Sequence, residues 1–148
     1  MGIKKIIILV LILSACAFAS CYLSGDEREN KKDYDENMLD LKIYHENLGD
    51  ALISKNKDYA EWFVNDMDSI LQSMAKKFTN HRKLQKPFQY EYEKRLAPHY
   101  SELKKNIAKE NWQQAINTYS IITINCNECH VDYKIKKKVR DYTKPRPT

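Results

Sequence analysis

Apolar side chains recur at every third or fourth position over most of the chain, which is the spacing of one face of an α-helix. Four such stripes cover residues 34–52, 59–78, 88–107 and 112–133, and only the short polar link 55–58 separates the first two. Amphipathic helices joined by short links pack as antiparallel neighbours. The pattern therefore predicts an all-α fold, an up-and-down antiparallel four-helix bundle.

Two positions bear on the last two helices. Pro98 interrupts the third stripe, and because proline removes a backbone hydrogen bond it should kink that helix or mark its true start. Asn111 can cap the fourth helix, with Gln114 closing a capping box. The fourth helix is expected to continue into the basic run after residue 133, roughly ten residues beyond His130.

Composition narrows the class of protein. A chain of 148 residues suits one domain with a single core. Its three glycines form no Gly-rich loop, and its formal charge of +5 is a modest excess mixed in sign along the helices. This distribution is not that of a nucleic-acid-binding surface. No nucleophile–base pair or carboxylate pair suggests an enzyme.

The N-terminus predicts export. Lys4 and Lys5 precede an apolar run, residues 6–13, that is shorter than the about 20 residues needed to cross a bilayer but typical of a signal peptide. The run ends in Leu-Ser-Ala-Cys, which resembles a bacterial lipobox with Cys16 as the lipidated residue. Cys21 is the alternative, and an ordinary cleaved signal or an uncleaved anchor also stays open.

These features divide the chain into four parts. Residues 1–15 (alternatively 1–20) are expected to form a lipoprotein signal peptide, and residues 16–32 a polar, lipid-anchored flexible tether. Residues 33–142 are expected to form the bundle, and the proline-containing residues 143–148 a disordered tail. The expected location is extracytoplasmic, on the periplasmic side of a bacterial membrane, and the sequence does not say which membrane.

Residues 126–130 spell C-x-x-C-H, the spacing at which haem is attached covalently in c-type cytochromes. Cys126 and Cys129 lie on one helical turn and can form thioethers to two vinyl groups, while His130 supplies an axial iron ligand. A disulfide is the structural alternative, but it would bridge only this local pair. A zinc site lacks a second ligand pair, and a redox C-x-x-C is expected at a helix N-terminus. The motif predicts one covalent haem c.

The segment from Cys126 to Lys134, C-x-x-C-H-x-x-Y-K, resembles the cytochrome c-prime family of class II c-type cytochromes. The Lys-Glu-Asn-Trp-x-x-Ala opening of the last helix is also similar to this family, so residues 110–134 carry the resemblance. Only 18 residues follow His130, which excludes the class I layout with an N-terminal motif and a distant Met ligand. The resemblance implies a four-helix bundle with haem near one end.

The resemblance also implies a distal position early on the first helix, filled by a ligating Met or by an apolar residue. Met38 matches that place as the sixth ligand, with plain core packing as the alternative. His45 lies two turns further along the stripe and is the alternative ligand, although a half-buried histidine that is hydrogen-bonded to a neighbour is the favoured explanation. Tyr133 and Lys134 follow His130 by three and four residues, so they should pack on the haem edge or meet a propionate.

Two functions follow. With both axial sites filled, the protein would be a membrane-tethered electron carrier that meets redox partner proteins in the periplasm. With an open distal site, it would bind NO or CO. A helical lipoprotein that acts as a structural or binding module is the third class, should haem be absent. A homodimer stays open, and the redox potential, spin state and partner do not follow from the sequence.

Overall fold

The computed structural model describes residues 33–79 and 84–145, and this part of the chain contains helices and turns but no β-strand. The first helix covers residues 33–53, and α2 covers Lys57–Lys77. Three consecutive elements follow as one helical run: α3 (Phe88–Glu91), the π-helix η1 (Tyr92–Leu96) and α4 (Ala97–Ala108). The last helix, α5, covers Trp112–Asp132. The all-helical prediction is confirmed for these residues.

The predicted signal peptide (1–15 or 1–20), the lipidation candidates Cys16 and Cys21, and the tether 16–32 lie outside the described residues. Residues from Tyr34 onward form one compact unit. Among the described residues, no helix is long and apolar enough to cross a membrane.

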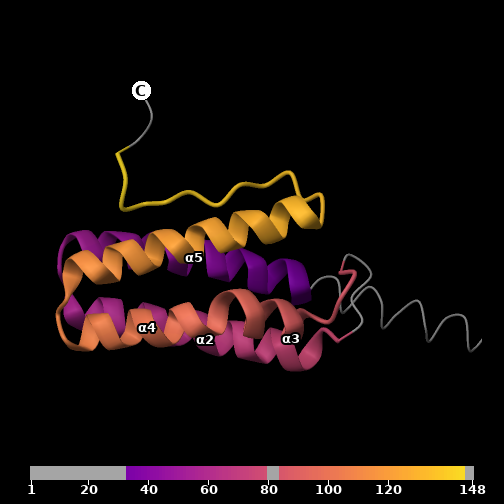
Figure 1. Cartoon of the computed structure of the whole chain (residues 1–148), viewed down its shortest axis with the longest axis horizontal. Coiled ribbons are helices and arrows are strands. Elements are labelled where there is room, and N and C mark those ends of the chain that lie inside the picture. Colours follow the sequence, from indigo (N-terminus) through magenta and orange to yellow (C-terminus); the bar gives the residue numbers. More distant parts are fainter. Residues whose placement is uncertain (1–32, 80–83, 146–148) are drawn as a thin grey trace, which may run out of the picture. The chain divides into compact units, whose positions relative to one another are not determined.

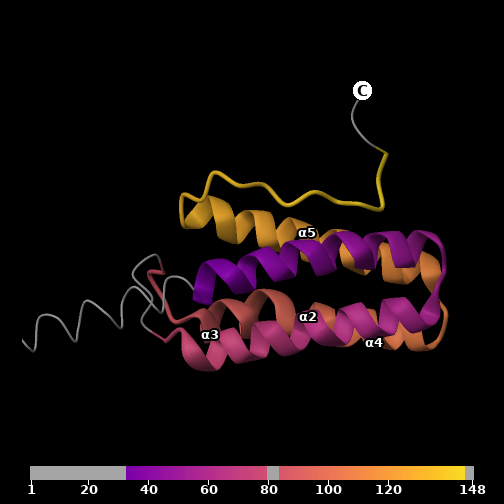
Figure 2. The same ribbon diagram turned by 180° about the vertical axis from the view of Figure 1, so that it is seen from behind.

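The helices lie side by side as a bundle (Figures 1 and 2), with α5 packed on α4 and α4 packed on α2. The apolar stripes of the sequence meet in the middle, so each helix buries the face that its periodicity marks. The largest side chains that are almost completely buried come from every helical run: Leu48, Leu52, Val64, Met74, Tyr100, Leu103, Ile107, Tyr119 and Ile122. Burial of this set is the main stabilising contribution.

Pro98 is accommodated by a π-helical turn instead of a helix break. Its ring carries no N–H and would clash with the carbonyl four residues earlier. In the turn just before it, the Ala97 N–H bonds to the Tyr92 carbonyl, five residues back. The extra residue in this turn lets the run continue from Phe88 to Ala108. The predicted kink at Pro98 therefore takes the form of a π-turn.

Three helices end on a non-glycine residue in the left-handed conformation: Lys55, Glu110 and Lys134, with φ of 55°, 57° and 55°. Each end has the double hydrogen bond of a Schellman motif. After the first helix, for example, the Asn56 N–H bonds to the Ala51 carbonyl at 2.9 Å and the Lys55 N–H bonds to the Leu52 carbonyl at 3.2 Å. These backbone bonds satisfy carbonyls that the helix itself leaves open.

Glycine should therefore stabilise these helix ends. Left-handed backbone strains any residue with a Cβ, so Lys55→Gly and Glu110→Gly should each raise the free energy of unfolding by about 1 kcal/mol. Urea unfolding measures the change. Lys42→Gly, on the exposed face of the first helix, is the matched control and should lower stability by about 1 kcal/mol. Loss of stability in all three variants would contradict the prediction.

The fourth helix is shorter than expected. It ends at Asp132, two residues after His130, so the prediction that it continues into the basic run is wrong. Residues 134–145, here called the C-terminal strap, turn back and run beside α5 (Figures 1 and 2, yellow).

The prediction for Asn111 at the start of α5 is only half correct. It is the N-cap residue of α5, but its side chain makes no capping hydrogen bond, so the capping box with Gln114 is absent.

Candidate functional site

The last two turns of α5 carry the C-x-x-C-H residues. Cys126, Cys129 and His130 are half-buried, and Cys126 packs against the hydrophobic core. Both thiols are free, so the local disulfide alternative is absent from this structure. The helical turn brings the two sulfurs to neighbouring positions on the inner side of α5, with the imidazole directly after them.

The two cysteines are poor nucleophiles here. Burial raises the pKa of Cys126 to about 12. Burial, and secondly the nearby Glu91, raise the pKa of Cys129 to about 11. Thiols of redox C-x-x-C pairs instead have lowered pKa values, typically at a helix N-terminus, whereas this pair lies at the C-terminal end of its helix. The geometry therefore disfavours a thioredoxin-like role. Among the described residues, no group of three or more His, Cys, Asp and Glu could hold a metal ion.

A backbone contact fixes the tautomer of His130. Its Nδ1 lies 2.8 Å from the carbonyl oxygen of Lys137 in the C-terminal strap. A carbonyl oxygen can only accept, so Nδ1 carries the proton and donates it. With Nδ1 engaged in this way, Nε2 is the nitrogen that could ligate a metal, as in histidines whose second nitrogen is held by a carbonyl.

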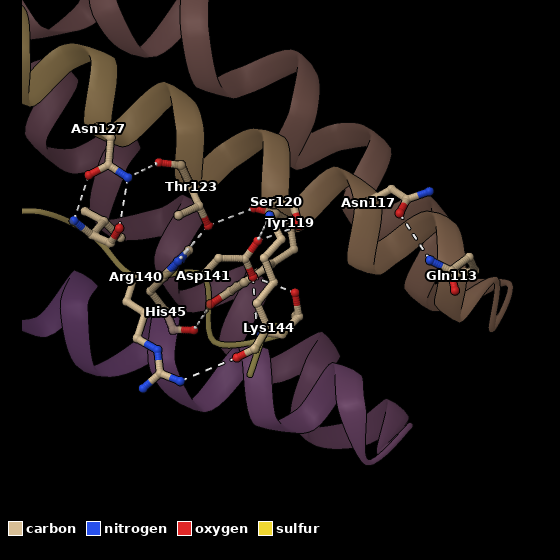
Figure 3. A network of polar contacts seen from close by, with 12 residues as sticks. His45, Gln113, Asn117, Tyr119, Ser120, Thr123, Asn127, Arg140, Asp141 and Lys144 are labelled. Carbon is tan, nitrogen blue, oxygen red and sulfur yellow. Dashed lines mark hydrogen bonds and ion pairs between the residues drawn. The ribbon is translucent and has the colours of Figure 1, made fainter. Parts of the chain in front are cut away.

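Asn127, inside the motif, holds the strap in place. Its side-chain Nδ2 donates to the Val139 carbonyl at 2.9 Å, and its Oδ1 accepts from the Val139 N–H at 2.8 Å (Figure 3). This pair of bonds resembles the pairing of two strands, made by one amide side chain. Further along, Ser120 of α5 donates to Asp141 at 2.7 Å. The strap therefore positions the Lys137 carbonyl at His130.

On the other side of Cys129, Arg95 connects η1 to the end of α5. Its Nε lies 2.8 Å from Oε2 of the buried Glu91, and its guanidinium also pairs with Glu128 and Asp132. Tyr133 donates to the other oxygen of Glu91 at 2.8 Å. Burial first, and then this hydrogen bond, raise the pKa of Tyr133 to about 12. These contacts fix the last turn of α5 against the third helical run.

The start of the first helix lies at the same end of the bundle. Tyr34 is buried, and its ring packs edge-on against Phe78 and Phe88 with centroid distances of 5.1 and 6.2 Å. Burial, and secondly the closeness of Cys129, raise the pKa of Tyr34. Met38 follows one turn later on the same side of the helix and is partly buried against the core. The structure therefore brings the first helix, Cys129 and Tyr133 together.

His45 lies deeper and is 3% exposed. Its Nε2 is 3.0 Å from Oγ1 of Thr123, and its ring stacks on Tyr119 with centroids 4.4 Å apart (Figure 3). Burial lowers the pKa of His45 to about 4, against the smaller opposing effects of a hydrogen bond to the Arg140 backbone and of Asp141. His45 is thus a neutral core histidine whose Nε2 is already engaged.

Lys134, expected near the haem edge, is exposed and ends α5 through its left-handed backbone. The contributions of Arg95, Asn127 and the Lys137 carbonyl were not predicted. Arg95 has a detectable signal, since Glu91 precedes it by four residues and Glu128 and Asp132 have the same spacing on α5. A backbone carbonyl has no sequence signal.

Two thiols and an imidazole thus follow one another on the last turns of α5, and the third helical run, the first helix and the strap all contact this end of the helix. No protein-family model, curated protein or solved structure matches this chain.

Proposed function

We propose that this chain is an exported, lipid-anchored c-type cytochrome with one covalent haem, and that it carries electrons. The supporting observation is the state of the motif. Cys126 and Cys129 are free thiols on one turn of α5, and Nδ1 of His130 donates to the Lys137 carbonyl, so Nε2 is the nitrogen available to ligate iron. In this proposal the helices form an up-and-down antiparallel four-helix bundle with haem near one end, as in the cytochrome c-prime family.

The residues present fit such a group. Two thiols and an imidazole with the correct tautomer are the donor set that covalent haem requires. Haem, when attached, supplies an iron that exchanges one electron between Fe(III) and Fe(II). The chain's part is to hold it: Cys126 and Cys129 through thioethers and His130 through Nε2. Tyr133 and Lys134 are the proposed packing residues, and Arg95 stiffens the turn that carries them.

Met38 is the proposed sixth ligand. Its thioether lies one turn beyond Tyr34, whose ring is close to Cys129, so it belongs to the same end of the bundle. A His45 ligand would first have to leave its bond to Thr123 and its stacking on Tyr119. Filling both axial sites favours electron transfer over binding of NO or CO, because no open coordination position is left.

The remaining parts of the proposal concern location and partners. Lipid on Cys16, or on Cys21, would anchor the chain on the periplasmic side of a bacterial membrane, where it would meet redox proteins and catalyse no reaction of its own. A homodimer is compatible with the exposed apolar side chains of the first two helices. These side chains are between 47% and 58% exposed: Leu39, Ile43, Ile53, Tyr59 and Trp62.

An absorption spectrum tests the proposal directly. The protein is expressed with a haem-attachment system and recorded oxidised, reduced, and reduced with CO. We expect covalent haem with a sharp reduced α band that CO leaves unchanged, since both axial sites are filled. Cys126→Ser with Cys129→Ser should abolish covalent attachment completely, because no thioether can form.

The axial ligand is assigned with a matched pair of variants. Met38→Leu should broaden the reduced band and allow CO to bind, whereas Met67→Leu, the same substitution at a buried core position of α2, should leave the spectrum unchanged. Both exchanges conserve volume, so neither should unfold the bundle. A wild-type spectrum that already shifts with CO would favour the gas-binding alternative. Absence of covalent haem would refute both functions and leave a helical lipoprotein.

A further inference from the structure

The charges of this chain are separated along the sequence. Residues 33–133 contain sixteen acidic and thirteen basic side chains, a formal charge of −3, whereas residues 134–148 contain seven basic and one acidic, a formal charge of +6. The moderate total therefore hides a strongly basic C-terminal segment attached to a slightly acidic bundle. Such asymmetry indicates a surface for an anionic partner.

The basic side chains of the strap are available at the surface. Lys136, Lys137 and Lys138, and Lys134 just after α5, are all exposed. Within the described part of the chain, no carboxylate forms an ion pair with any of these four. The apolar side chains between them, Ile135 and Val139, are half-buried instead of exposed. The strap therefore presents charge outward without an apolar face.

This charge is held in a fixed place. Asn127 binds Val139 through two hydrogen bonds, and Asp141 accepts from Ser120 (Figure 3). At Gly49 the first helix approaches the strap so closely that a Cβ would lie 2.7 Å from Cβ of Tyr142. A basic segment fixed in this way loses less conformational entropy on binding than a free tail does.

The strap also touches the candidate site, since the Lys137 carbonyl accepts the hydrogen bond from His130. A partner bound to the strap lysines would thus lie beside the axial ligand. Exposed charge without apolar anchors is typical of weak, electrostatically steered contacts, such as those between electron-transfer proteins. An amphipathic segment embedded in a membrane surface would expose apolar side chains between its basic residues, and purely electrostatic attraction to anionic lipid is distinguished from protein docking by vesicle binding.

We propose that the C-terminal strap is the docking surface for the acidic face of a protein redox partner. The inference rests on the proposed electron-carrier function, and it adds the chemistry of the partner and the place where it binds. The acidic bundle contributes specificity, because it repels the same partner elsewhere on the surface.

Two charge-reversal variants of the full chain test the docking surface. One carries Lys136→Glu and Lys138→Glu in the strap, and its matched control carries Lys42→Glu and Lys105→Glu on exposed helix positions, so both have the same net charge. The probe is a fluorescein-labelled poly-glutamate peptide, followed by anisotropy. The wild type should bind it more weakly as salt rises, and the strap variant should bind on the order of tenfold more weakly than the control.

The binding results distinguish docking of an acidic protein from attraction by net charge and from binding to a membrane. Equal weakening in both variants would mean that net charge alone binds the peptide and would overturn the proposal. Strap-dependent binding to phosphatidylglycerol vesicles, with no strap-dependent binding of the peptide, would assign the strap to a membrane and overturn it as well. The haem absorbance of the same samples is recorded separately. A chain without haem that still binds the peptide through the strap would refute the electron-carrier function and retain the acidic-partner surface.

Discussion

The free energy of unfolding should fall by about 3 kcal/mol between pH 6.5 and pH 4, because His45 stays neutral in the folded protein. Its pKa is lowered from 6.5 to about 4 by burial, and the ring lies between Tyr119, Thr123 and the strap. Over this interval the unfolded chain binds a proton that the folded protein does not. Stability is therefore complete above pH 6.5 and is lost as the pH falls towards the folded pKa.

Urea unfolding at several pH values, compared between wild type and His45→Gln, isolates this contribution. The variant should be less stable at neutral pH, but it should lose about 3 kcal/mol less on acidification. Asp141, the nearest carboxylate, does not produce the same effect. Its pKa is lowered below 3.8, mainly by hydrogen bonds that outweigh its partial burial, so its contribution is lost only at still lower pH. Parallel pH profiles of the two proteins would contradict the prediction.

Replacing Arg95 by Met should lower the free energy of unfolding by about 3 kcal/mol. The variant leaves Glu91, which is 5% exposed, without the guanidinium that compensates its charge. It also removes the pairing with Glu128 and Asp132 that connects η1 to α5. Because Arg95 is itself partly exposed, the expected loss in the free energy of unfolding lies at the lower end of the range for broken buried ion pairs.

Two further variants separate charge from packing. Adding Glu91→Gln to Arg95→Met should recover part of the lost stability, because no buried charge then remains. Lys94→Met, an exposed neighbour on the same element, should change stability by less than about 0.5 kcal/mol. Urea unfolding at neutral pH measures all three proteins. Equal losses for Lys94→Met and Arg95→Met would show that the ion pairs contribute nothing specific.

The helices could be predicted from the sequence because their apolar stripes are long and uninterrupted. Leu48 and Leu52 on the first helix, and Leu103 and Ile107 on α4, fall on the spacing that buries them, and all four are at most 1% exposed. Burial of a stripe is a local property of the helix, so periodicity alone locates it.

The end of α5 could not be predicted in the same way. The basic run that begins at Lys134 contains good helix formers, and the local pattern contains no glycine that would stop the helix. The helix nevertheless ends because Lys134 adopts a left-handed conformation and Asn127 binds the backbone of Val139. This contact spans twelve residues, and such tertiary contacts override propensity.

The residues of the candidate site likewise fall into two groups: those that a local sequence pattern identifies and those that only the packing of the helices reveals. Cys126, Cys129 and His130 could be predicted because the C-x-x-C-H motif that they form occupies five consecutive residues. The spacing of Glu91 and Arg95 indicates an ion pair on one helix, but the pairing of Arg95 with Glu128 and Asp132 depends on the packing of η1 against α5, which no local pattern encodes. The sequence left His45 open between a ligand and a core residue, and the structure shows its bond to Thr123.

The π-turn before Pro98 holds one residue more than a regular helical turn. Because the wide turn absorbs that residue, a regular α-helix one residue shorter would keep Phe88 and Glu91 on the same buried face. Homologous chains that lack the proline at position 98 should therefore tolerate a single-residue gap between Phe88 and that position. A gap of two residues would instead turn the preceding segment by about 100°, carry Phe88 and Glu91 off the core face, and separate Glu91 from Tyr133.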